Sequence, residues 1–223
     1  MYVMNPINVT IKRIIVYIFR LFFLSLGVSL SIHAGLGVSP VSSLAYAFTL
    51  TVGLSIGMTT ILTNVLFIFC QVILNKRIHM KEFTLQFIIA FLFGFFMDAT
   101  LFLVQLLPTP ESIFMRCLYL LLSLFVVSFG LLNYFTAKLP LMPYDALTYV
   151  ISERFNWKFS KAKITSDLLN VSVAGTVCLI FIQSFGSIGF GTLAAAYFIG
   201  KILGWMMKDY QHPLQQWVFQ IKS

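Results

Sequence analysis

Six apolar stretches of about 20 residues each run through the sequence, and they restrict its fold more than any other feature. A helix needs about that length to cross the hydrocarbon core of a bilayer. The chain is 59% hydrophobic and 10% charged, whereas about a quarter of the residues in a soluble domain are charged. We therefore predict an all-α membrane protein with six transmembrane helices, at residues 14–34, 56–74, 83–106, 113–135, 164–182 and 188–207.

The Lys and Arg residues predict the orientation of these spans, because cytoplasmic loops carry an excess of both. With a cytoplasmic N-terminus, most of the 15 basic residues fall on that side, and the outer loops at 35–55, 107–112 and 183–187 hold none. Arg20 and Lys201 lie toward the cytoplasmic ends of their spans, where we expect their side chains to snorkel to the interface. We predict a multi-pass protein of the bacterial inner (cell) membrane with both termini in the cytoplasm. The net charge of +8 reflects this orientation and does not indicate a nucleic acid partner.

The two halves of the chain resemble each other. A shift of 103 residues, which places Pro40 on Pro143, also aligns Arg13 with Arg116, Gly27 with Gly130 and Tyr46 with Tyr149. We interpret the chain as one membrane domain, 1–223, made of repeats at about 13–106 and 113–208 and an interfacial tail at 209–223. Each repeat holds three spans, so the second repeat must insert upside down, an arrangement that recurs in secondary transporters.

A short apolar segment follows the first span of each repeat, at 41–51 and 144–155. Eleven residues of helix reach roughly 16 Å, which is too short for a hydrocarbon core of about 30 Å. A proline precedes each segment and suits the first turn of a helix. We predict two Pro-led helices that do not span the membrane, the first capped by Ser39. The sequence leaves open whether either helix enters the bilayer.

Short motifs accompany these segments. GLGVSPVSSL at 35–44 corresponds to LPLMPYDAL at 139–147, and GFGT at 189–192 opens the last span. On these motifs the chain resembles the YczE/YyaS/YitT-type family of bacterial membrane proteins, in which G-x-G-x-x-P-W-D-x-L recurs in each half. The first copy lacks the Trp-Asp pair and the second lacks the glycines, so the resemblance implies a shared architecture and not a shared ligand. The matching structural residues are Gly35, Gly37, Pro40, Pro143, Gly189, Gly191 and Thr192.

Asp98 lies two-thirds of the way along the third span. A carboxylate in a bilayer costs at least a few kcal/mol, so it must face a cavity, pair with a cation or carry a proton. Two readings stay open: a substrate or proton site, and a structural hydrogen bond near the outer interface.

Four further polar residues are candidates for a substrate site. Asp145 and Ser42 occupy the same repeat position, two residues after the proline, where a helix cap is the alternative role. Asp167 and Asn64 also align, and an ion pair with a nearby lysine is the alternative for Asp167. Because the positive ends of short helices favour anions, we expect a ligand that carries a carboxylate or phosphate.

The function that these features predict is small-molecule transport by a permease-like protein. The alternatives are a substrate-capture subunit, similar to the S-components of multi-component vitamin importers, and a non-catalytic accessory protein. The sequence indicates no enzyme and no cofactor, because it holds no cluster of a nucleophile, a base or metal ligands. It indicates no metal site, because its three His residues fall on separate segments. The expected partners are the lipid bilayer, an unidentified small molecule, and either a second copy of the chain or another membrane subunit.

Overall fold

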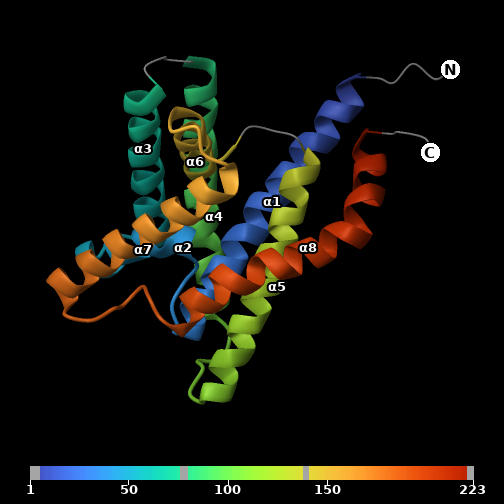
Figure 1. Cartoon of the computed structure of the whole chain (residues 1–223). Coiled ribbons are helices and arrows are strands. Elements are labelled where there is room, and N and C mark those ends of the chain that lie inside the picture. Colours follow the sequence, from blue (N-terminus) through green and yellow to red (C-terminus); the bar gives the residue numbers. More distant parts are fainter. Residues whose placement is uncertain (1–5, 76–79, 138–140, 220–223) are drawn as a thin grey trace.

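The computed structural model of the chain describes residues 6–75, 80–137 and 141–219, and the regular secondary structure of this part is entirely α-helical (Figure 1). The eight helices are α1 (Pro6–Ala34), α2 (Pro40–Val52), α3 (Ile56–Asn75), α4 (Met80–Gln105), α5 (Ile113–Ala137), α6 (Pro143–Arg154), α7 (Phe159–Ile182) and α8 (Phe190–Phe219). α8 continues through much of the stretch that we predicted as an interfacial tail, with Pro213 inside the helix.

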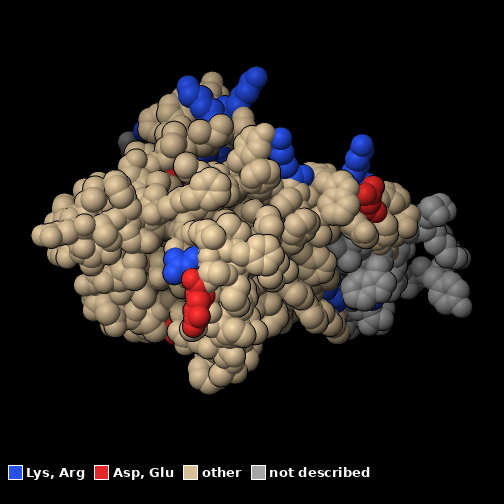
Figure 2. All heavy atoms as spheres, turned by 90° about the horizontal axis from the view of Figure 1, so that it is seen from below, with Lys and Arg blue, Asp and Glu red and all other residues tan. Residues whose placement is uncertain are grey.

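Six of these helices, α1, α3, α4, α5, α7 and α8, are long and apolar enough to cross a membrane, as predicted. Large apolar side chains cover their outward faces, and Phe114, Phe181 and Leu193 are each at least 70% exposed. Figure 2 shows one face of the molecule, which carries only scattered charged side chains. A surface of this kind suits lipid as the surrounding solvent.

The two short helices also form where the sequence predicts them. α2 has 13 residues and α6 has 12, which is about 20 Å and 18 Å of helix. Each begins at its proline, and the preceding residue, Ser39 or Met142, has the extended backbone that a following proline requires. The prediction that Ser39 caps α2 is wrong. Its hydroxyl donates to the Ser42 hydroxyl at 3.3 Å and makes no capping bond.

The helices pack in pairs that cross between the two halves of the chain. α1 lies along α5, α2 packs against α7, and α3 packs against α6. α1 also contacts α4, and α5 contacts α8. Every one of these contacts has a counterpart when α1 to α4 are exchanged for α5 to α8.

Two glycines let α1 and α5 approach closely. A Cβ atom on Gly27 would lie 2.8 Å from the backbone nitrogen of Val127, and one on Gly130 would lie 3.0 Å from that of Leu24. These four residues are two aligned pairs of the 103-residue shift, so each helix presents the same face to the other.

The connection between α1 and α2 is joined to the start of α8 through a set of backbone contacts that we call the glycine junction. Its hydrogen bonds run from Gly191 N–H to the Leu36 carbonyl at 2.6 Å and from Val38 N–H to the Ser187 carbonyl at 3.1 Å. Gly37 has φ +97°, and a Cβ there would lie 2.4 Å from the Gly189 nitrogen. Only glycine fits such a contact.

The first described turn of α1 and the last of α8 lie at the same side of the molecule, together with the start of α4 (Figure 1). The connections after α1, α4 and α7 lie toward the opposite side. This arrangement agrees with an even number of crossings.

Candidate functional site

A cavity of about 720 Å³ lies at the centre of the molecule. Every one of the eight helices contributes to its wall, and so does the residue before each short helix, Ser39 and Met142. Pockets for small molecules measure about 300–1,000 Å³, so this cavity has the size of a small-molecule site.

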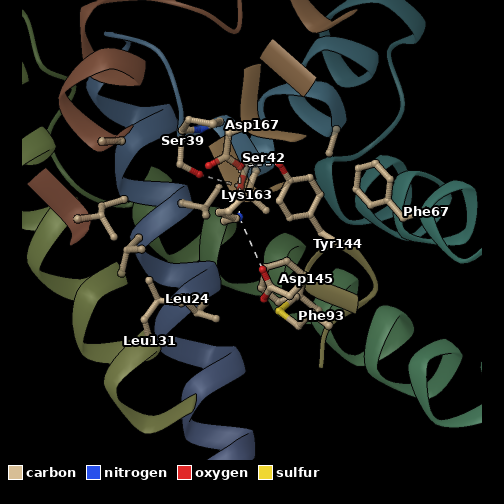
Figure 3. Close-up of a pocket in the computed structure, with 18 of the residues that line it drawn as sticks. Leu24, Ser39, Ser42, Phe67, Phe93, Leu131, Tyr144, Asp145, Lys163 and Asp167 are labelled. Atoms are coloured by element: carbon tan, nitrogen blue, oxygen red, sulfur yellow. Dashed lines mark hydrogen bonds and ion pairs between the residues drawn. The ribbon is translucent and has the colours of Figure 1, made fainter. Parts of the chain in front are cut away.

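One part of the cavity wall is charged. Lys163 lies between two carboxylates, with its Nζ 3.2 Å from Asp167 Oδ1 and 3.6 Å from Asp145 Oδ1. The same Nζ lies 4.2 Å from the centre of the Tyr144 ring, and the Tyr144 hydroxyl donates to Asp167 at 2.5 Å. We call Tyr144, Asp145, Lys163 and Asp167 the ion cluster (Figure 3).

The local sequence explains how the ion cluster forms. Lys163 and Asp167 are four residues apart on α7 and therefore share one face of that helix. Tyr144 and Asp145 lie in the first turn of α6, which Pro143 begins. The ion pair that we offered as the alternative role of Asp167 is present, and its partner is Lys163.

Tyr144 is the neutral member of the ion cluster. Burial raises the pKa of its phenol far above the usual value, and the negative charge of Asp167 raises this pKa further. The phenol consequently keeps its proton at any physiological pH and remains a hydrogen-bond donor to Asp167.

The two short helices are each held in place by an amide from the opposite half. Asn170 of α7 donates to the Pro40 carbonyl at 2.6 Å, and Gln71 of α3 donates to the Pro143 carbonyl at 2.9 Å. Gln71 also exchanges two hydrogen bonds with Gln86 of α4. We did not select Gln71 or Gln86 from the sequence, although two buried amides in neighbouring apolar spans are a signal for such a contact.

The rest of the cavity wall is mainly apolar. Aliphatic side chains come from α1 and α5, and aromatic ones from α3 and α4, as Figure 3 shows for Leu24, Leu131, Phe67 and Phe93. Among the described side chains of α8, those that line the cavity are Ala195, Ala196, Ile199, Gly200 and Leu203.

Arg20 corrects a prediction. Its side chain does not snorkel to the surface but is fully buried beside the cavity, with the guanidinium 5.0 Å from the centre of the Tyr17 ring. Hydropathy placed this residue near the end of a span but could not show that its face of α1 turns inward. Lys201, by contrast, is exposed and donates to the Tyr197 hydroxyl.

The structure brings four of the five predicted site residues together. Ser42, Asn64, Asp145 and Asp167 all line the cavity. Asn64 is buried, and its amide donates to the Thr60 carbonyl within α3.

Asp98 lies outside the cavity wall and binds the start of α3 instead. Its Oδ1 accepts from Gly57 N–H at 2.7 Å, and its Oδ2 accepts from the Ser55 hydroxyl at 2.8 Å. A carboxylate at a helix N-terminus satisfies free N–H groups and complements the helix dipole. This geometry matches the second of the two readings of Asp98, a structural hydrogen bond.

The predicted motif glycines and Thr192 are likewise absent from the cavity wall. Gly37, Gly189, Gly191 and Thr192 belong to the glycine junction, whereas Gly35 follows the end of α1 and faces Arg116. Within residues 6–75, 80–137 and 141–219, no group of three His, Cys, Asp or Glu side chains is placed to hold a metal ion.

The sequence matches the family of unknown function DUF6198 over residues 11–208. Among curated proteins, the chain is 31% identical over 180 residues to "Uncharacterized protein YyaS" of Bacillus subtilis (strain 168), which covers 81% of this chain and 85% of that protein. It is 24% identical over 192 residues to an "Uncharacterized protein" of Haemophilus influenzae, which covers 86% of this chain and 82% of that protein. No solved structure matches the chain.

Proposed function

The chain belongs to the DUF6198 family, as its likeness to YyaS-type proteins predicted, and on that premise we propose that it is a membrane transporter for a small molecule. The observation that carries the proposal is the central cavity, about 720 Å³ in volume, with walls from all eight helices. A solute held there contacts both halves of the chain. A relative movement of the halves then changes which side of the membrane reaches the solute.

An inverted repeat is part of this proposal. It is supported by the symmetric exchange of helix contacts and by the α1–α5 crossing, where Gly27 meets Val127 and Gly130 meets Leu24. The shift of 103 residues relates these two contacts to each other. Inverted repeats with discontinuous short helices place substrate sites between the repeats near the bilayer midplane.

The proposed orientation places both termini in the cytoplasm of a bacterial cell. To test it, single cysteines replace Pro110 or Ser184 on one side and Lys158 on the other, in a chain whose three native cysteines are changed to alanine. An impermeant maleimide added to intact cells should label positions 110 and 184 but not 158. Labelling of position 158 alone would reverse the orientation.

The substrate-capture and accessory roles are the alternatives to transport. Both predict that the chain acts only with a second protein, whereas a transporter works alone or as copies of itself. We propose a non-catalytic role in each case, because the hydroxyl that meets a carboxylate in the ion cluster belongs to Tyr144, and burial raises the pKa of this phenol and so makes it a poor nucleophile.

The transport proposal is tested with the purified chain in proteoliposomes. Solutes that raise its unfolding temperature are selected first, and their uptake is then measured. Asp167→Asn, in the cavity, should reduce uptake at least tenfold, whereas Asp98→Asn, outside it, should leave the affinity for the solute unchanged. Uptake that needs an added ATPase subunit would favour substrate capture, and equal uptake by both variants would contradict a site in this cavity.

A further inference from the structure

The cavity has an opening that the proposed transport function does not by itself require. We propose that the cavity opens sideways into the lipid between α7 and α8, and that its ligand is an amphiphile with a cationic ammonium headgroup. This inference rests on the proposed function and adds the route and the chemical class of the substrate.

The opening follows from how α7 and α8 are placed. Both helices line the cavity, α7 through Phe159, Lys163, Ile164 and Asp167 and α8 through its small and aliphatic residues. Yet the described residues of these two helices do not pack along each other, whereas α3 and α4, their counterparts in the first half, do. In Figure 1 the start of α8 is displaced from the end of α7, and the 183–189 connection spans the distance between them.

The sequence shows why one pair of helices closes and the other does not. In the first half, Gly57 and Gly94 let the backbones of α3 and α4 touch, and Asp98 of α4 binds the start of α3. The 103-residue shift replaces these three residues with Ser160, Tyr197 and Lys201. A tyrosine prevents the close approach, and a lysine cannot accept from helix N–H groups.

The opening faces a surface suited to acyl chains. In the most apolar stretches of α7 and α8, only 28% and 22% of residues are buried, against 50% and 39% in α3 and α4. At the opening itself, a Cβ on Gly200 would meet no atom within 4 Å. An apolar tail can therefore lie along α8 while a polar headgroup reaches the ion cluster.

The accessible charges select the headgroup. Asp145, Asp167 and Lys163 are between 21% and 29% exposed, and together they carry one net negative charge. The Arg20 guanidinium also lines the cavity, but its side chain has no exposed area, so it offers a ligand no hydrogen-bond donor. An ammonium group can compete with Lys163 for the two carboxylates and can contact the Tyr144 ring, which already faces the Lys163 ammonium. This reverses the anionic ligand expected from the helix ends.

Binding of decyltrimethylammonium tests the chemical class, with decanoate as the anionic probe of equal chain length. The full chain is placed in phosphatidylcholine nanodiscs, and empty nanodiscs correct for partition into lipid. Saturable binding of the ammonium compound is expected, at least tenfold tighter than binding of decanoate. Asp167→Asn should weaken it at least tenfold. Tighter binding of decanoate, or no saturable binding of either probe, would overturn the proposed headgroup.

Tryptophans at two glycines of α8 test the route. Gly200→Trp places an indole in the opening, and Gly204→Trp is its matched control, one turn away, outside the cavity wall and equally free of neighbours. Gly200→Trp should weaken decyltrimethylammonium binding at least tenfold, and Gly204→Trp should change it less than twofold. With the native tryptophans changed to phenylalanine, brominated lipid should quench Trp fluorescence in the Gly200→Trp chain.

Two results would overturn the lateral route. One is quenching of that fluorescence by aqueous iodide and not by brominated lipid. The other is protection from both quenchers, which indicates that a second copy of the chain covers the opening. A water-soluble solute that crosses proteoliposomes while decyltrimethylammonium does not bind would retain transport and reject the amphiphile.

Discussion

The two halves of the molecule follow one plan of helices but differ in how firmly they close. In the first half, α3 and α4 touch through Gly57 and Gly94 and share the Asp98 carboxylate. In the second half, α7 and α8 do not pack along each other, although both line the cavity. The difference teaches that a few side chains at equivalent positions decide whether a three-helix unit is closed or open.

The two halves also use their carboxylates differently. Asp98 in the first half holds helices together and lies away from the cavity, whereas Asp167 in the second half lines it beside Lys163. The first half therefore uses its carboxylate to join two helices, and the second half supplies the ion cluster that can meet a ligand.

The largest effect is expected from a substitution that separates α3 from α4. In Gly94→Val, the new Cβ would lie 2.5 Å from Ile61 Cγ1 and 2.8 Å from the Gly57 carbonyl oxygen. We expect a loss of about 2–3 kcal/mol in the free energy of unfolding, as is usual for overpacking. Thermal unfolding in nanodiscs measures it. Gly204→Val in the open half is the control and should change stability by less than about 0.5 kcal/mol. Equal losses at both positions would remove the contrast between the halves.

The next effect concerns the amides that hold the short helices. Asn170→Leu and Gln71→Leu each leave a buried proline carbonyl without its donor, and we expect losses of about 1–2 kcal/mol. The loss at Gln71 should be the larger because Gln86 also loses its partner. Unfolding temperatures of the two variants give the comparison. A neutral Asn170→Leu variant would show that α2 is held by apolar packing alone.

The smallest change in stability is expected at Asp98 and Lys201, which occupy aligned positions in the two halves. Asp98→Ala removes the acceptor at the start of α3 and should cost about 1 kcal/mol. Lys201→Ala removes only an exposed contact with Tyr197 and should cost less than about 0.5 kcal/mol. Unfolding temperatures again provide the measurement, with ligand affinity measured in parallel. Loss of affinity in Asp98→Ala at unchanged stability would return Asp98 to the candidate site.

The sequence predicted where the helices lie along the chain better than it predicted which face of each helix turns inward. Hydropathy over about 20 residues is a local property, so it identified all six long helices, and the prolines located the starts of α2 and α6. Which face of a span meets a cavity depends on distant helices. For that reason the sequence did not show that Arg20 is buried or that Asp98 turns toward α3.

The candidate site was predicted in part for the same reason. The repeat pointed to Asn64 and Asp167, and the positions after the prolines pointed to Ser42 and Asp145, which all line the cavity. The Lys163–Asp167 pair follows from a spacing of four residues, but the hydrogen bond from Tyr144 to Asp167 requires α6 and α7 to meet, and no spacing along the chain contains that information.

The glycine junction has a consequence for biogenesis. It joins Leu36 and Val38, which a ribosome makes early, to Ser187 and Gly191, which it makes late. A nascent chain therefore cannot complete these two hydrogen bonds until its last membrane helix has been synthesised. Until then the connection between α1 and α2 lacks its final partner, and α2 is without Asn170 as well. The closing step of assembly thus waits for the synthesis of α8, and a product truncated before α8 differs from a longer one in the connection between α1 and α2.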